Sequence, residues 1–190
     1  MPRACRARAA PSIRAPVPGQ TACGPGAPGY LPTMVLLPED VRAYPRPPAL
    51  EPVGETLEVV FGGALVARTR RGLRVLESHH APTYYFPPED VAPGVLRPGA
   101  GRSFCEWKGR AAYFDLTAGG STAPGAAWSY PDPTPAFAAL RDHVAFYAGR
   151  VEACRVGGVV ATPQPGGFYG GWVTPNLSGI VKGGPGTEGW

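Results

Sequence analysis

Two Gly-Gly pairs separate short apolar runs in this chain, and each predicts a tight antiparallel hairpin. They are Gly62-Gly63, inside a predicted hairpin over 55–69, and Gly157-Gly158, inside one over 151–162. Glycine accepts the positive φ that two-residue hairpin turns require. Because such turns place neighbouring strands side by side, the spacing favours a fold made mainly of β-strands.

Composition agrees with this interpretation. Glycine and proline, 27 and 25 of 190 residues, are interspersed with aromatic and β-branched residues. That mixture is typical of turns and irregular loops between strands rather than of wholesale disorder. We therefore predict a mainly β fold with long Gly/Pro-rich loops and one short helix. The helix has Thr134 as its cap and Pro135 at its first position, and a single helical turn is predicted at 87–91.

The first 33 residues differ from the rest of the chain. They hold four arginines and no acid, which accounts for the whole formal charge of +4 and leaves the remainder neutral. We predict a disordered Arg/Ala/Pro/Gly-rich tail over 1–33 and a single domain over 34–190. We expect Met34 to be the native first residue; the alternative is a working tail. A neutral domain gives no case for a nucleic-acid partner.

Four cysteines, at positions 5, 23, 105 and 154, form no C-x-x-C pair. A structural zinc site needs about four closely placed ligands, so we expect no metal and no cofactor. Cys105 and Cys154 are predicted to be reduced, buried thiols of a cytoplasmic protein. No apolar run reaches the roughly 18 residues of a membrane span, so we expect no membrane partner. The expected oligomeric state is a monomer or weak homodimer.

The run 103–116 predicts a central hairpin. With Gly109-Arg110 as a two-residue loop, Glu106 lies across from Tyr113, and side chains alternate between two faces. One face is apolar and is predicted to be core: Cys105, Trp107, Ala112, Phe114 and Leu116. The other mixes ionisable and aromatic residues: Phe104, Glu106, Lys108, Tyr113 and Asp115.

The mixed face supplies the candidates for chemistry. Glu106, Lys108 and Tyr113 together suit the orientation of a polar ligand or the movement of a proton, and His79 is a further acid–base candidate. The candidate catalytic residues are therefore Glu106, His79 and Lys108. An ordinary cross-strand ion pair, worth under about 1 kcal/mol, is the preferred alternative until burial is known. Cys105 with His79 or His80 is another candidate pair, but its apolar face predicts a packed thiol.

Aromatic residues give the strongest indication of a ligand. Rings with a polar tip suit partly open pockets, because the ring packs while the tip forms hydrogen bonds. The rings are Tyr84, Tyr85, Phe86, Trp128, Tyr130, Phe168, Tyr169 and Trp172. Each one taken singly is expected to be core, yet at least two are expected to line one cleft. The predicted ligand-binding residues are Tyr84, Tyr85, Glu106, Lys108, Tyr113, Trp128 and Tyr130.

Six motifs in order resemble the bacterial family catalogued as domain of unknown function 427, over about residues 40–190. They are 44–48, 60–63, 82–91, 103–109, 127–131 and 166–172. The resemblance implies a β-tent-like fold, in which two small antiparallel sheets lean together. That fold also occurs in thalidomide-binding domains, methionine sulfoxide reductase B and zinc-bearing Yippee-like domains.

Two properties of relatives do not carry over. Many β-tent proteins hold zinc with two C-x-x-C knuckles, which this chain does not have. The family is sometimes labelled a nucleotidyltransferase, but no Gly-x-x-x-x-Gly-Lys-Ser/Thr loop and no Asp-x-Asp pair is present. We therefore predict a domain that binds a small molecule in an aromatic cleft. The alternatives are a small enzyme using Glu106, His79 and Lys108, and a protein-interaction module using the Pro-rich and Gly-rich ends.

Overall fold

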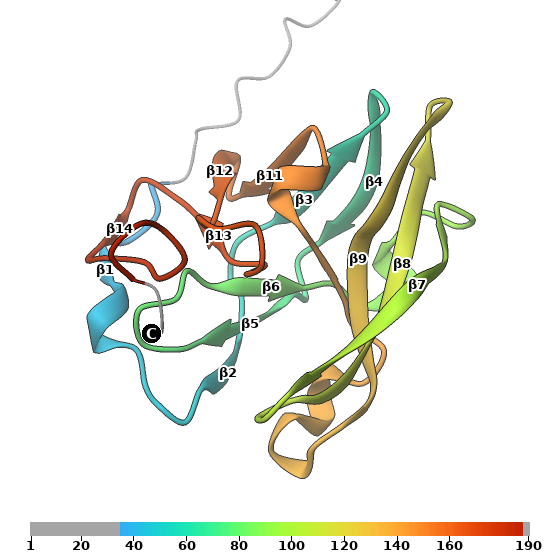
Figure 1. Cartoon of the computed structure of the whole chain (residues 1–190). Coiled ribbons are helices and arrows are strands. Elements are labelled where there is room, and N and C mark those ends of the chain that lie inside the picture. Colours follow the sequence, from blue (N-terminus) through green and yellow to red (C-terminus); the bar gives the residue numbers. More distant parts are fainter. Residues whose placement is uncertain (1–34, 188–190) are drawn as a thin grey trace, which may run out of the picture. The chain divides into compact units, whose positions relative to one another are not determined.

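The computed structural model describes residues 35–187, and strands dominate it (Figure 1). The described strands form three antiparallel sheets, of four, five and three strands, and a separate two-stranded parallel pair. The predicted class, mainly β with small antiparallel sheets, is confirmed. The β-tent name for this arrangement and the single domain over 34–190 stay predictions. The tail predicted for residues 1–33 lies outside the described residues.

The five-stranded sheet contains both Gly-Gly hairpins. Its order is β13 (Trp172–Val173), β12 (Val159–Pro163), β11 (Ala153–Val156), β3 (Leu57–Phe61) and β4 (Ala64–Thr69). Gly62 and Gly63 have φ values of 59° and 70°, and Gly157 and Gly158 have 57° and 86°. Both predicted turns are confirmed, because each glycine adopts the left-handed backbone that the turn requires.

The four-stranded sheet contains the three longest strands. Its order is β10 (Val144–Phe146), β9 (Ser121–Pro133), β8 (Gly109–Ala118) and β7 (Leu96–Cys105). The strand predicted around Trp128 is the middle of β9. The loop predicted at 98–101 instead lies within β7, where the register with β8 shifts between Pro98 and Arg102. An irregular strand therefore replaces the predicted loop.

The three-stranded sheet connects to the four-stranded one through β6. Its order is β2 (Ala49–Pro52), β5 (Leu73–Leu76) and β6 (Thr83–Tyr85). Directly after β6, the Phe86 N–H donates to the Val144 carbonyl and the Val144 N–H donates to that of Phe86, each at 2.8 Å. The parallel pair is β1 (Glu39–Asp40) with β14 (Leu177–Ser178).

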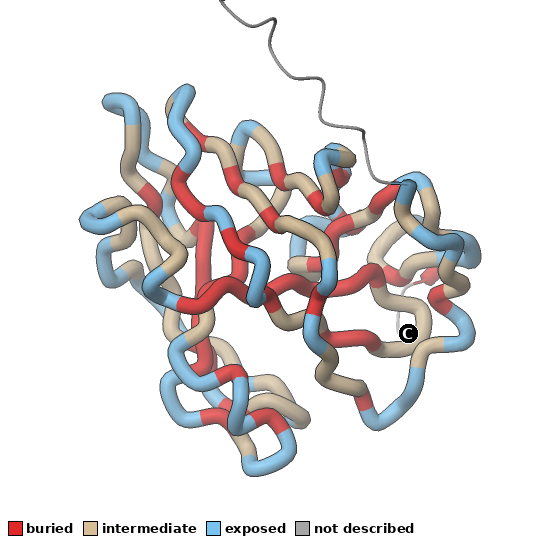
Figure 2. The backbone as a smooth tube through the Cα atoms, turned by 180° about the vertical axis from the view of Figure 1, so that it is seen from behind, coloured by how far each residue is buried: buried red, intermediate tan, exposed pale blue. Residues whose placement is uncertain are grey.

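Two buried clusters lie on opposite sides of β6. Side chains alternate along a strand, so Tyr84 and Phe86 enter one cluster while Tyr85 enters the other. The first cluster also contains Trp172 and the second contains Trp128. Buried positions gather along the strand centres and exposed ones at the hairpin tips (red and pale blue in Figure 2).

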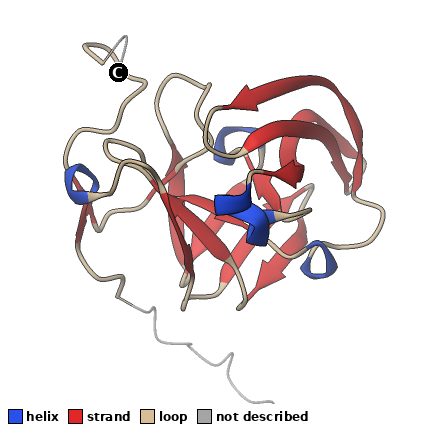
Figure 3. Ribbon diagram, turned by 90° about the horizontal axis from the view of Figure 1, so that it is seen from below, coloured by secondary structure: helices blue, strands red, loops and turns tan. Residues whose placement is uncertain are grey.

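All helices within residues 35–187 are short 3₁₀ segments (blue in Figure 3). They are η1 (Val41–Ala43), η2 (Pro88–Asp90), η3 (Pro135–Leu140) and η4 (Ala148–Arg150). The turn predicted at 87–91 is confirmed as η2. The predicted helix starting at Pro135 is present as η3, with non-helical dihedrals at Phe137. In this part of the chain, no helix is both long and apolar enough to cross a bilayer.

Candidate functional site

A cavity of about 340 Å³ is bordered by the second cluster, the β7–β8 turn and the loop after β12. Its aromatic lining residues are Tyr85, Phe104, Trp107, Tyr113, Trp128, Tyr130, Tyr147, Phe168 and Tyr169. Its charged lining residues are Arg46, Glu77, Glu106, Lys108 and Lys182. Rings and charges on one concave surface are the usual composition of a small-molecule site.

The β7–β8 turn differs from the prediction. Gly109-Arg110 is not the loop: residues 106–108 form a three-residue turn, and Cys105 pairs with Gly109. Gly109 has a φ of 97°, and a Cβ there would lie 3.2 Å from the Asp132 carbonyl oxygen on β9. Glycine is therefore needed at the first position of β8, beside its neighbouring strand, rather than inside a two-residue loop.

This register also overturns the predicted separation of two faces. Cys105 and Trp107, assigned to the core, and Glu106 and Lys108, assigned to the opposite face, all line the same cavity. Cys105 is half-buried rather than sealed in the core, and its thiol is free. Cys154 is also a free thiol; it is buried, as predicted, and burial raises its pKa well above the usual range.

Most of the predicted ligand-binding residues meet at this cavity. The six that line it are Tyr85, Glu106, Lys108, Tyr113, Trp128 and Tyr130. Of the candidate catalytic residues, Glu106 and Lys108 are present, but His79 is not part of the described lining. The His79 Nδ1 atom lies 3.0 Å from the Ile180 carbonyl oxygen, and His80 borders the cavity in its place. A ligand-binding role for these residues stays a prediction.

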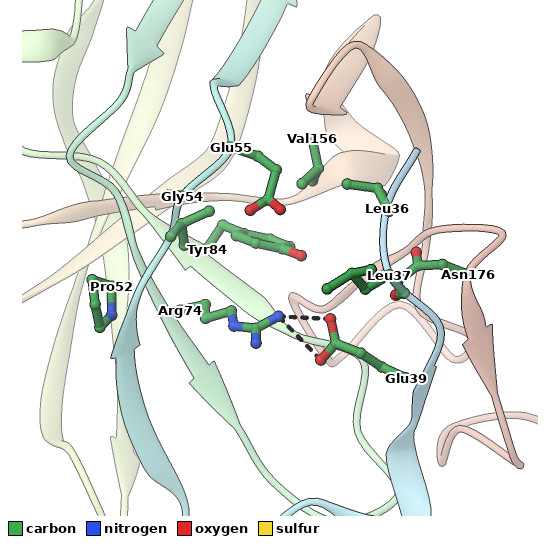
Figure 4. Close-up of a pocket in the computed structure, with 11 residues that line it drawn as sticks. Leu36, Leu37, Glu39, Pro52, Gly54, Glu55, Arg74, Tyr84, Val156 and Asn176 are labelled. Carbon is green, nitrogen blue, oxygen red and sulfur yellow. Dashed lines mark hydrogen bonds and ion pairs between the residues drawn. The ribbon is translucent and has the colours of Figure 1, made fainter. Parts of the chain in front are cut away.

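The seventh residue, Tyr84, borders a separate cavity of about 220 Å³ (Figure 4). There Arg74 lies 2.8 Å from Glu39 and 3.1 Å from Glu51 in a double ion pair. Burial raises the Tyr84 pKa well above its usual range, so the hydroxyl is protonated at neutral pH. The guanidinium of this smaller cavity is therefore already occupied by the protein's own carboxylates.

Ion pairs neutralise both carboxylates of the larger cavity. Glu77 accepts from Lys182 at 3.1 Å and from Arg46 at 2.8 Å, and Arg46 also lies 3.4 Å from Glu106. Lys108 differs: its Nζ lies about 6 Å from the ring centres of Tyr130 and Phe137. Within residues 35–187 no carboxylate pairs with it.

Three phenols of the cavity are protonated at neutral pH. Burial is the main cause that raises the pKa values of Tyr85, Tyr130 and Tyr147 above their usual range. The Tyr85 hydroxyl is completely buried and has no hydrogen-bond partner of ordinary geometry among the described residues. The Trp128 indole N–H can donate to the oxygen of this hydroxyl. The hydroxyl proton still has no acceptor among the described residues.

His80 is held as a neutral imidazole. Burial lowers its pKa to about 4, and the positive charges of Lys182 and Lys108 add to that effect. The ring packs edge-on against Tyr169, with ring centres 5.2 Å apart. Its Nδ1 lies 2.5 Å from the Ala81 carbonyl oxygen, so the proton of the neutral ring resides on Nδ1.

We expect the His80 pKa to make the protein less stable in mild acid. In the unfolded chain His80 is protonated below about pH 6.5, whereas in the folded protein it stays neutral down to about pH 4. Stability should therefore fall between pH 6.5 and 4, by at most about 3 kcal/mol, and by less because part of the ring reaches solvent. Urea unfolding of the wild type and of His80→Gln at pH 7 and 4.5 measures this. An equal acid loss in both proteins would contradict it.

The loop after β12 closes one side of the cavity through two contacts that the sequence did not indicate. Buried Gln164 accepts from the Ala81 N–H at 3.1 Å and donates to the Lys182 carbonyl at 3.0 Å. Gly170 lies directly against the six-membered ring of Trp128, where a Cβ would overlap ring atoms. The loop is therefore fixed at close range to the cavity wall.

A family model described as domain of unknown function (DUF427) matches residues 49–157, more than half of the chain. The chain belongs to the DUF427 family. The DUF427 match extends from β2 through β11 and includes the predicted ligand-binding residues, whereas Tyr169 and Lys182 lie beyond it. No curated protein matches the chain. Within residues 35–187 of this DUF427 protein, no group of three or more His, Cys, Asp or Glu residues is placed to hold a metal.

Proposed function

We propose that this DUF427 domain binds a small molecule in the 340 Å³ cavity. The observation that carries the proposal is the buried hydroxyl of Tyr85, a residue that lines the cavity: none of the described residues provides an acceptor for the hydroxyl proton. A buried polar group left unpaired costs about 1–3 kcal/mol, so a site that retains one is explained by a ligand that satisfies it.

The ring content of the wall supports the same proposal. Trp128 and Tyr147 lie with ring centres 4.4 Å apart, and Tyr85 packs edge-on to Trp128. Phe104 and Phe168, which also line the cavity, are 72% and 75% exposed. Large apolar side chains gain little by facing water, so exposed rings at a cavity suit contact with a ligand.

A screen of small aromatic and polar compounds, including nucleosides, cyclic imides and modified amino acids, tests the proposal. Trp107 and Trp128 line the cavity, so a bound compound should change the intrinsic fluorescence. It should also slow alkylation of Cys105, which peptide mass mapping distinguishes from that of the other three cysteines. A screen in which no compound gives either signal would count against the proposal.

Gly170→Ala provides the matched variant for any compound found. The new methyl group would overlap Trp128, so the ring must move and binding should weaken at least tenfold. Gly54→Ala is the control, since nothing lies within 4 Å of a Cβ there. Equal affinity of the Gly170→Ala and Gly54→Ala proteins would place the compound outside this cavity.

A further inference from the structure

Two groups of the cavity are donors without an acceptor or a counter-charge among the described residues. The Tyr85 hydroxyl is protonated at neutral pH and is buried without an acceptor, and the Lys108 ammonium group pairs with no carboxylate. An ammonium group donates hydrogen bonds and accepts none. A ligand that satisfies this set must therefore present acceptor atoms.

The charge of the cavity has a definite sign. Glu77 and Glu106 are the acidic lining residues, and both are engaged by Arg46, with Lys182 as a second partner of Glu77. His80 is neutral at pH 7. Lys108 is therefore the cation left without a counter-charge among the described lining residues, and a bound anion would supply that counter-charge.

Resting on the proposed function, we propose that the ligand is a small planar aromatic anion. Its ring lies among the tyrosine and tryptophan rings, and its carboxylate or phosphate pairs with Lys108 and accepts from the Tyr85 hydroxyl. The volume of about 340 Å³ is at the small end of ligand sites, which favours one or two fused rings over a larger molecule.

The electrostatic surroundings support an anion at this position. The ammonium groups of Lys182 and Lys108 both lower the His80 pKa, while the Glu77 carboxylate that pairs with Lys182 raises it, so Lys108 supplies the positive field that no carboxylate of the described lining offsets. Aromatic walls exclude water and strengthen that field. An acid should therefore bind more tightly than a neutral compound of the same shape.

Isothermal titration with 2-naphthoate, 2-naphthyl phosphate and neutral 2-naphthamide tests the inference. We expect at least one of the two anions to bind at least tenfold more tightly than the amide. Naphthoate alone would identify a carboxylate site, and the phosphate alone a phosphate site. Equal affinities of all three would overturn the anion inference while leaving the proposed function intact.

Variants locate the anion. Lys108→Gln should weaken anion binding about tenfold and leave amide binding unchanged, whereas Lys108→Arg should retain most of the preference. Arg110→Gln is the matched control, because Arg110 is an exposed cation on β8 outside the cavity lining. An equal effect of Lys108→Gln and Arg110→Gln would show that net charge, and not the cavity, sets the preference, and would overturn the inference.

Tyr85→Phe tests the hydroxyl independently. It should weaken naphthoate binding about threefold to tenfold while keeping the ring and its packing. Unchanged affinity would remove Tyr85 from the site. If no naphthyl compound binds while another compound protects Cys105, the ligand class is wrong and the proposed function stands; if nothing binds or protects, both fail.

Discussion

Trp172→Ala should lower the free energy of unfolding by about 3–5 kcal/mol, the usual cost of removing a large buried aromatic ring. Trp172 is 0% exposed in the first cluster and packs with ring centres 5.1 Å from Tyr84 and 6.0 Å from Phe86. Its indole N–H donates to the Phe146 carbonyl at 2.9 Å. The substitution therefore opens a cavity and removes a buried hydrogen bond in one step.

Urea unfolding followed by circular dichroism measures this change. Trp172→Phe should cost less, about 1–3 kcal/mol, because it keeps a ring and loses mainly the donor to Phe146. Trp107→Ala is the matched control: Trp107 is only half-buried at the β7–β8 turn, so its loss should matter less. A Trp172→Ala protein as stable as Trp107→Ala would show that β13 contributes little to the first cluster.

The strands that local rules could predict are those with tight glycine turns. Gly62-Gly63 and Gly157-Gly158 determine their hairpins through backbone conformation alone, and the structure has both as predicted. A pattern of residues adjacent in sequence was sufficient there. The mainly β class followed from the same signals.

The β7–β8 turn could not be predicted in this way, because the role of its glycine involves a third strand. Gly109 has a positive φ in a strand position where β9 approaches closely. From the sequence alone, a glycine before Arg110 indicates an ordinary two-residue loop. The contact that restricts this position to glycine is with the Asp132 carbonyl oxygen, more than twenty residues away, and no local sequence pattern indicates it.

The site residues likewise include some that local sequence patterns indicated and some that they did not. The ring-rich stretches indicated Tyr85, Trp128 and Tyr130, which do border one cavity. Tyr84 and Tyr85 could not be told apart, since both sides of β6 are buried and neighbouring rings point to opposite clusters. No sequence pattern in the Gly/Pro-rich segment around Lys182 indicated that this residue lines the cavity.

Glu77→Gln should lower the free energy of unfolding by about 3 kcal/mol, the lower end for breaking a buried ion pair. The side chains of Glu77 and Lys182 are only 14% and 9% exposed, and Arg46 approaches the same carboxylate. Removing the negative charge leaves an ammonium group out of water with a second cation nearby. The pair joins the segment after β5 to the segment near the C-terminal end of the described chain, so its loss should loosen that connection.

Removing the Lys182 charge should lower the free energy of unfolding by less than removing the Glu77 charge does. The difference between these two losses is the measurement that tests the explanation. In Lys182→Met the Glu77 carboxylate keeps Arg46 at 2.8 Å, and that arginine side chain is 53% exposed, so no unpaired charge is buried. The double variant Glu77→Gln/Lys182→Met should be more stable than Glu77→Gln alone, because methionine replaces the ammonium group that Glu77→Gln leaves buried and unpaired. Equal losses from Glu77→Gln and Lys182→Met, with simple additivity in the double variant, would show that the two charges act independently.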